Sequence, residues 1–260
     1  MHVPEALFEP LGRGRYRTTE LAQGPWDPGA QHGSPPAALL AGSFEAEHPR
    51  PDLVPTRFTM DLFGPVPMGE LEVRTRVARD GRRIQALDGE LLSGGRVAAR
   101  ARAWRVRRAD TADIASPTPP PPAEIPADTA PPPSGTGDFG YFSALDWRFA
   151  AGGFRTPGPA TAWLRLRVPV VAGREPTPIE RVMGVVDCSS GVSNELDFAS
   201  YVFTNVDLTV HLHRPLAGEW VCTDAKTTIG DEGAGLCRAT LSDEKGGLGG
   251  SAQTLFIGPR

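Results

Sequence analysis

The sequence has few cysteines and few lysines, and each scarcity excludes a class of protein. Its three cysteines, Cys188, Cys222 and Cys237, are odd in number and show no CxxC spacing, so we expect free buried thiols and no disulfide framework or zinc site. Lys226 and Lys245 are the only lysines, and 31 acidic residues outnumber 27 basic ones. Because a nucleic-acid surface needs clustered positive charge, nucleic acid is not an expected partner.

Long apolar runs are also missing. No stretch approaches the roughly 18 apolar residues of a membrane span, and residues 1–5 contain neither the basic region nor the apolar run of a signal peptide. We therefore expect a cytoplasmic protein without membrane contact. The chain has 260 residues, of which 40% are hydrophobic, which is enough for one large or two smaller globular domains.

Proline is abundant in one segment. Residues 109–137 contain repeated prolines with almost nothing apolar between them, which is typical of an extended spacer. This linker predicts two domains, at residues 1–108 and 138–260.

The two halves repeat weakly, which indicates a duplication. Residues 56–65 resemble residues 206–215 at an offset of 150, and the turn at Gly94 lies 152 positions before the turn at Gly246.

Each half is expected to hold one buried apolar helix. The segment Thr177-Pro178-Ile179-Glu180 has the form of a capping box, with a hydroxyl at the N-cap, proline at N1 and a carboxylate at N3. Apolar residues recur at helical spacing as far as Val186, and Gly191 can end this helix in the left-handed conformation. In the first half, Ser34-Pro35-Pro36 opens a second apolar helix that continues through residues 37–41.

Strand-like runs bounded by turn residues follow each helix. They occupy residues 56–64, 69–79, 84–93, 96–107, 202–213, 219–229, 234–242 and 248–257, with further runs at 14–21, 146–151 and 160–170. The pattern predicts an α+β fold in which a curved antiparallel sheet embraces a central apolar helix, twice over.

Four segments occur in an order and spacing that point to one family. They are residues 31–37 (Gln-His-Gly-Ser-Pro-Pro-Ala), residues 185–188 (Val-Val-Asp-Cys), residues 205–215 and residues 251–255 (Ser-Ala-Gln-Thr-Leu). With them the chain resembles the double-hotdog thioesterase superfamily, specifically its type II acyl-CoA thioesterase branch. The resemblance covers nearly the whole chain outside the linker and implies a tandem hotdog fold.

The resemblance also implies a site. In that family an Asp at the end of the second helix, a hydroxyl residue at the start of the next strand and a Gln in the last strand hold the hydrolytic water. Here these positions are Asp187, Asn205 and Gln253; Asn205 departs from the usual Thr or Ser, and a slip of one residue would put Thr204 there instead. The segment His32-Gly33-Ser34 resembles the turn that opens hotdog helices, where backbone N–H groups polarise a thioester carbonyl.

Each of these residues also has an ordinary structural interpretation. Asp187 could cap the following turn in solvent, Gln253 and Asn205 could be polar strand residues, and His32-Gly33-Ser34 could be a plain helix start. Asp187 stands out because an acid in the last turn of an apolar helix faces the negative end of the helix dipole. Such locally costly choices are typical of functional sites, and apolar surroundings raise a carboxylate's proton affinity toward that of a useful base.

The repeat locates the chemistry in the second half only. At the same offsets, Gln253 corresponds to Ala101 and Asp187 corresponds to the Ala37-Ala38 region, so we expect one site per chain.

The implied reaction is hydrolysis of an acyl-CoA thioester to a free acid and CoA, with Asp187 acting as a general base or attacking directly, and with no metal or cofactor. His211 and His213 alternate on one strand face, but no cysteine or acid completes a metal set. Two other functions stay open: a non-catalytic acyl-CoA-binding module, and an enoyl-CoA hydratase, which needs an Asp/His pair although no histidine is near Asp187 in the sequence. A homo-oligomer is a further expectation, because hotdog sheets often pair.

Overall fold

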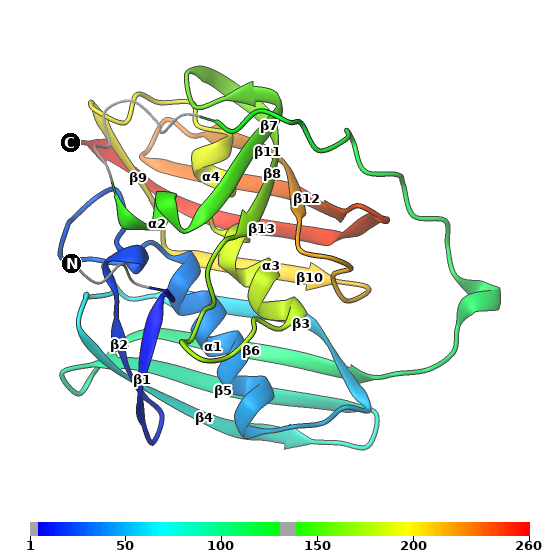
Figure 1. Ribbon diagram of the computed structural model, residues 1–260. Helices are drawn as coiled ribbons and strands as arrows, with labels where there is room; N and C mark the ends of the chain where they lie inside the picture. The colour runs from blue at the N-terminus through cyan, green and yellow to red at the C-terminus, as the bar shows by residue number, and fades with distance from the viewer. Residues whose placement is uncertain (1–4, 131–138) are drawn as a thin grey trace.

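A single antiparallel sheet runs through both halves of the computed structural model, which describes residues 5–130 and 139–260 (Figure 1). The first half contains β1 (Phe8–Gly12), β2 (Arg15–Thr18), α1 (Ser34–Glu47), β3 (Leu53–Leu62), β4 (Glu70–Asp80), β5 (Ile84–Ser93) and β6 (Arg96–Arg107). The second half contains α2 (Gly140–Ser143), β7 (Leu145–Gly153), β8 (Thr156–Leu166), α3 (Pro178–Val186), α4 (Ser189–Val192), β9 (Tyr201–Asn205), β10 (Asp207–Leu212), β11 (Val221–Ile229), β12 (Ala234–Asp243) and β13 (Gly246–Pro259). The strand order is β1-β2-β4-β5-β6-β3-β10-β13-β12-β11-β8-β7, with β9 also paired to β13. Central helices within an antiparallel sheet confirm the expected α+β architecture.

The strands β3 and β10 join the two halves. They pair antiparallel, and Thr59 lies opposite Thr209. These two residues are also 150 positions apart, which is the offset of the repeat, so a pseudo-two-fold axis passes between them. At the β1 edge of the sheet the halves touch again, because the Phe8 N–H donates to the Val170 carbonyl at 3.0 Å.

Both predicted helix starts are confirmed. Pro35 and Pro36 occupy the first turn of α1, where the fixed φ of proline suits the helix and a missing N–H costs nothing. At the start of α3, Thr177 Oγ1 accepts from the Glu180 N–H, and the Glu180 carboxylate accepts from the Thr177 N–H at 2.8 Å. The second contact completes the predicted capping box.

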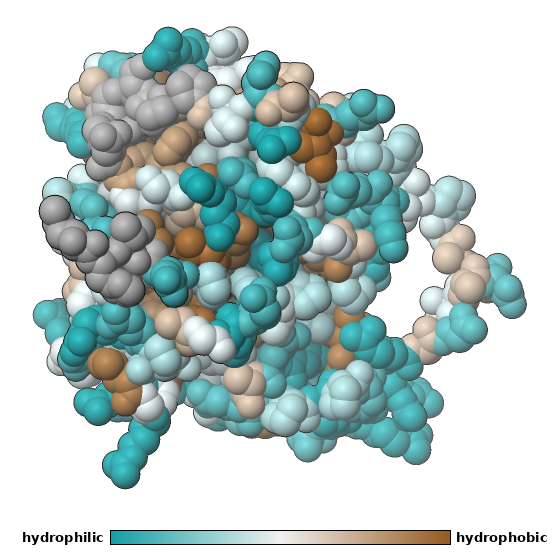
Figure 2. All heavy atoms as spheres, in the orientation of Figure 1, coloured by the Kyte–Doolittle hydropathy of each residue, from teal (hydrophilic) through white to brown (hydrophobic). Residues whose placement is uncertain are grey.

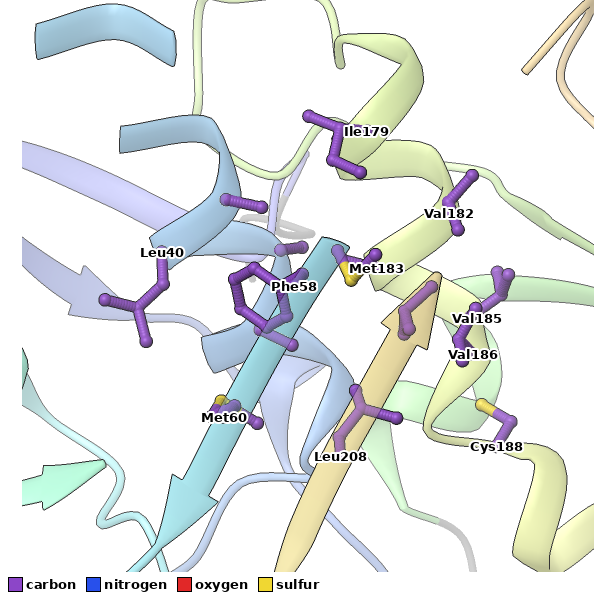
Figure 3. Packing of buried hydrophobic residues seen from close by; sticks show 14 of the residues in the cluster. Leu40, Phe58, Met60, Ile179, Val182, Met183, Val185, Val186, Cys188 and Leu208 are labelled. Carbon is purple, nitrogen blue, oxygen red and sulfur yellow. The ribbon is translucent and has the colours of Figure 1, made fainter. Parts of the chain in front are cut away.

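The helices α1 and α3 lie side by side and share one core with the sheet (Figure 1). Figure 3 shows Leu40 of α1, Met183 and Val186 of α3, Phe58 of β3 and Leu208 of β10 gathered in this core. Each such buried side chain contributes about 1.5–3 kcal/mol relative to exposure. Hydrophilic residues cover most of the molecular face seen in Figure 2, and hydrophobic ones surface in small separate patches, one of them near the middle of this face.

The expected end of the second helix is wrong. Helix α3 ends at Val186, and Gly191 lies inside the short helix α4 without a positive φ. The Cys188 N–H donates to the Val185 carbonyl at 3.0 Å, so the chain keeps right-handed turns through Asp187 and does not need a left-handed glycine to leave the helix.

The described part of the proline-rich segment, residues 109–130, contains one short 3-10 helix, Ala112–Ile114. It swings away from the sheet after β6 and returns toward β7 (Figure 1). On its way the Pro119 carbonyl accepts from the Gly247 N–H at 3.0 Å, and the Ala130 N–H donates to the Trp147 carbonyl at 2.7 Å. The rest of the predicted linker, residues 131–137, lies outside the described residues.

Candidate active site

Asp187 is a buried carboxylate at the C-terminal end of α3, with 4% of its surface exposed. Asn205 Nδ2, at the end of β9, donates to Asp187 Oδ1 at 2.6 Å. Gln253 Nε2, on β13, donates to the same oxygen and to the Asp187 backbone carbonyl, both at 3.1 Å. The three residues selected from the sequence are therefore in direct contact.

A shift in strand register decides which residue of β9 reaches Asp187. Asn205 lies opposite Leu255 of β13, whereas Thr209 lies opposite Ala252, so the register changes by one residue around Val206. This bulge reverses the alternation of side chains. Leu208 and Val210 face inward, so in an unbroken strand every second residue before them, including Thr204, would also face inward. The bulge shifts this alternation by one residue, and Asn205 faces Asp187. The Thr204 hydroxyl has no hydrogen-bond partner within residues 5–130 and 139–260, although Thr204 lines the neighbouring cavity.

The start of α1 lies against the other carboxylate oxygen. His32 Nδ1 is 3.3 Å from Asp187 Oδ2, and the Gly33 N–H donates to Asp187. A Cβ atom on Gly33 would lie 2.5 Å from Oδ2, so a residue without a side chain is needed for this approach. Ser34 is fully buried, with its Oγ 3.9 Å from Cys188 Sγ. The site thus combines groups from both halves of the chain.

His32 and Asp187 are placed to share a proton. The Ser34 N–H donates to His32 Nδ1 at 3.1 Å, which requires a lone pair on that nitrogen. The same lone pair faces Asp187 Oδ2. When Nδ1 carries no proton, its contact with Oδ2 is favourable only if the Asp187 carboxyl group is protonated. When Nδ1 is protonated, Nδ1 donates to Asp187 instead. Protonation of one group therefore affects the other, and the two titrate as a coupled pair.

Burial dominates the electrostatics of this pair. Loss of solvent raises the pKa of Asp187, while the nearby His32, the Asn205 and Gln253 amides and the Gly33 N–H partly oppose the shift. Burial lowers the pKa of His32, against the attraction of Asp187. Cys188 also has a raised pKa because of burial and the Asp187 charge, which keeps its thiol protonated and excludes it as a thiolate nucleophile.

The helix-start amides are less available than the resemblance implies. Pro35 and Pro36 have no N–H, and the N–H groups of Gly33 and Ser34 already donate to Asp187 and His32. If Ser34 donates to Nδ1, the neutral imidazole carries its proton on Nε2. That nitrogen has no partner in the described parts of the chain, and His32 lines the cavity, so Nε2 is a free donor there.

A cavity of about 460 Å³ opens beside Asp187 and draws its walls from both halves. Eight of its lining residues are aromatic, whereas aromatic residues make up 7% of the chain. They are Trp26, Phe63, Phe139, Trp147, Phe154, Phe198, Phe203 and Phe256. In the described part of the chain no arginine or lysine lines the cavity, so its chemistry suits an apolar group held next to a carboxylate.

Sequence reasoning missed several parts of this site. The Tyr141 ring stacks on His32, with centroids 4.7 Å apart and planes at 21°, and so fixes the imidazole orientation. The aromatic residues that line the cavity were also missed. One signal was available, because Trp26 follows the turn-forming pair Gly24-Pro25, which indicates a loop position and not a core position. No histidine is near Asp187 along the sequence, but His32 from the other half of the chain lies beside it in space.

Within the residues that the structure describes, no group of three or more His, Cys, Asp or Glu side chains could hold a metal ion. In the same residues, no helix has the length and apolar character needed to cross a membrane.

The sequence matches two family models in tandem. Residues 22–106 match the acyl-CoA thioesterase N-terminal domain, and residues 119–257 match the acyl-CoA thioesterase C-terminal domain. No curated protein matches the sequence significantly.

Solved structures show the same fold along nearly the whole chain. A protein from Novosphingobium aromaticivorans, provisionally named as a thioesterase, has a TM-score of 0.74 and 20% identity over 96% of this chain and 98% of its own. A hotdog protein of unknown function from Alicyclobacillus acidocaldarius has a TM-score of 0.72 and 15% identity, covering 96% and 95%. An acyl-CoA thioesterase II from Mycobacterium marinum has a TM-score of 0.64 and 15% identity, covering 97% and 94%. These likenesses confirm the tandem hotdog fold.

Proposed function

Because the chain belongs to the acyl-CoA thioesterase family, we propose that it hydrolyses acyl-CoA thioesters to a free acid and CoA at Asp187. The observation that carries this proposal is a buried carboxylate that is held by two amide donors and borders an aromatic cavity. Burial raises the pKa of Asp187, which makes the ionised carboxylate a stronger base than an exposed one.

In the proposed reaction, Asp187 accepts a proton from the water that attacks the thioester carbonyl. Asn205 and Gln253 hold Oδ1, and so orient the carboxylate. His32 Nε2 donates to the carbonyl oxygen as negative charge develops there. The carbon–sulfur bond then breaks, and the proton that Asp187 took from the water passes to the departing thiolate, giving the acid and CoA.

Direct attack by Asp187 on the carbonyl is the alternative use of the same carboxylate. A single turnover in heavy-oxygen water separates the two routes. A general base places heavy oxygen in the first acid released. Direct attack expels CoA and forms an anhydride with Asp187; when water opens this anhydride at the Asp187 carbonyl, the first acid released carries an ordinary oxygen from Asp187.

Replacement of Asp187 by Asn tests the site. Asparagine keeps an oxygen for the two amide donors but cannot take a proton from water, so thiol release from a panel of acyl-CoAs should fall by ~10³-fold. Asp27→Asn is the matched control, because Asp27 lines the same cavity and its Oδ1 accepts from the Gly29 N–H, a bond that Asn can keep. Full activity in Asp187→Asn would remove Asp187 from the mechanism, and acyl-CoA binding without turnover by the wild type would favour a non-catalytic binding module.

Hydration of an enoyl-CoA is a second candidate function, because the 3.3 Å contact of His32 with Asp187 supplies an acid and a base on one cavity wall. In this reaction Asp187 would activate water for addition to the β-carbon, and His32 would protonate the α-carbon. Loss of the enoyl absorbance without thiol release would favour hydration; thiol release from saturated acyl-CoAs supports hydrolysis.

A further inference from the structure

Among the residues that the structure describes, none that lines the cavity beside Asp187 is an arginine or lysine that could receive the phosphates of CoA. Within residues 5–130 and 139–260, its charged lining groups apart from His32 are the carboxyl groups of Asp27 and Asp187. CoA carries a diphosphate and a 3′-phosphate, and proteins bind such groups with arginine, lysine or backbone N–H groups. If the proposed function holds, the nucleotide end of the substrate therefore lies outside this cavity.

One side of the cavity mouth is apolar and exposed. Phe63, Val206 and Phe256 line the cavity and are 58%, 43% and 55% exposed. They are neighbours at the seam of the halves, since the Leu62 N–H donates to the Val206 carbonyl at 2.9 Å and Phe256 pairs with Thr204. Exposed rings at a mouth can stack with a planar base.

A second groove begins where this mouth ends. The Arg100 guanidinium lies over the Phe63 ring, 5.5 Å from its centroid, and Arg100 lies opposite Asp61 in the pairing of β3 with β6. Both Asp61 and Arg100 line a groove of about 770 Å³ on the outer face of the first-half sheet. Its charged lining residues are Arg57, Arg74, Arg76, Arg100, Arg102, Asp61, Asp88 and Glu90.

The groove carries an excess of positive charge, with five arginines against three acids. Arg100 donates to Glu90 at 2.9 Å and Arg102 to Asp88 at 2.7 Å, so these guanidinium groups are held in place. Arg57 has no ion pair or hydrogen bond from its side chain within the described residues. A free guanidinium among fixed ones can bind an incoming phosphate through two parallel N–H donors without first breaking a salt bridge.

We propose that this arginine groove binds the phosphates of the 3′-phosphoadenosine diphosphate end of acyl-CoA, with the adenine against Phe63 and the pantetheine arm leading to Asp187. The proposal rests on acyl-CoA as the substrate. Arg155 is the rival cation, since it follows the cavity residue Phe154 in the sequence and has no ion pair among the described residues.

The test compares one acyl group on CoA and on pantetheine, which lacks the nucleotide. With Arg57→Gln and with Arg100→Gln, KM for the acyl-CoA should rise by ~10-fold each, because one charge-assisted bond contributes about that factor. The kcat values, and both constants for the acyl-pantetheine, should stay unchanged. Arg96→Gln is the matched control, as Arg96 is an exposed arginine on the same strand, β6, outside the groove.

Any of three results would overturn the assignment. They are an equal rise of KM for both substrates, an unchanged KM in both groove variants, or a rise of KM for the acyl-CoA alone in Arg155→Gln. Calorimetric binding of CoA and of pantetheine tests the groove independently of turnover. Three results would support the groove even if no hydrolysis were seen. CoA should bind more weakly to Arg57→Gln, and CoA binding should depend more steeply on salt in the wild type than in the variant. Pantetheine binding should stay unchanged. In that case the proposed function fails and the groove stands; CoA binding unaffected by both groove variants refutes the groove alone.

Discussion

Replacement of Gly33 by alanine should disable the site while leaving the fold intact. Gly33 has φ −69° and ψ −23°, which alanine adopts without strain. The added Cβ would lie 2.5 Å from Asp187 Oδ2 and 2.8 Å from its Cγ, where ordinary contact begins at 3.4 Å. The gap between the two residues must therefore open by about 0.9 Å.

The carboxylate has little freedom to retreat, because Asn205 and Gln253 hold its other oxygen. A misplacement of about 1 Å costs on the order of 10²-fold in rate, which corresponds to about 2.7 kcal/mol of transition-state stabilisation. Overpacking lowers the free energy of unfolding by about 1–3 kcal/mol. Exchanging glycine for alanine raises it by about 0.4–1 kcal/mol, because the unfolded chain has less conformational freedom. Activity should therefore suffer more than stability.

The assay measures kcat/KM for an acyl-CoA beside Tm for Gly33→Ala and for Gly191→Ala. Gly191 lines the same cavity and an added Cβ there meets nothing within 4 Å, so this control should keep both values. Wild-type kcat/KM in Gly33→Ala, or an equal loss in the two variants, would refute the steric reasoning.

Three further predictions concern the same site. Asp187→Asn should raise Tm at neutral pH, because the folded-state pKa of Asp187 is raised and its ionised form destabilises the fold. The gain should shrink as pH falls through that pKa and vanish below the unfolded-state pKa; a gain that persists at lower pH would contradict this origin. His32→Phe keeps a ring for stacking on Tyr141 but removes the interaction with His32 that lowers the pKa of Asp187, so the acidic limb of the kcat/KM profile should move to higher pH; an unmoved limb would show that the two groups do not interact. Asn205→Ala should lower kcat by about 10-fold or more through the lost bond to Asp187, whereas Thr204→Ala should change it little; the reverse order in steady-state kinetics would show that the Val206 bulge is misplaced.

Local chemistry made much of the fold predictable. A capping box at Thr177, prolines in the first turn at Pro35, and apolar residues at helical or strand spacing depend on neighbours a few positions away. The repeat offset added the relation between the halves, which the Thr59–Thr209 pairing later displayed. Asp187 could be selected because an acid ending an apolar helix breaks a local rule.

The sequence by itself thus determined most of the elements, the relation between the halves and the acid at the centre of the candidate site. The tertiary structure decided what surrounds that acid. A single bulge at Val206 turns Asn205 rather than Thr204 inward, and a bulge depends on pairing with a distant strand. The contact of His32 with Asp187 joins residues from opposite halves, so no spacing along the chain encodes it. The burial that raises the pKa of Asp187 likewise exists only after α1, α3 and the sheet have closed around it.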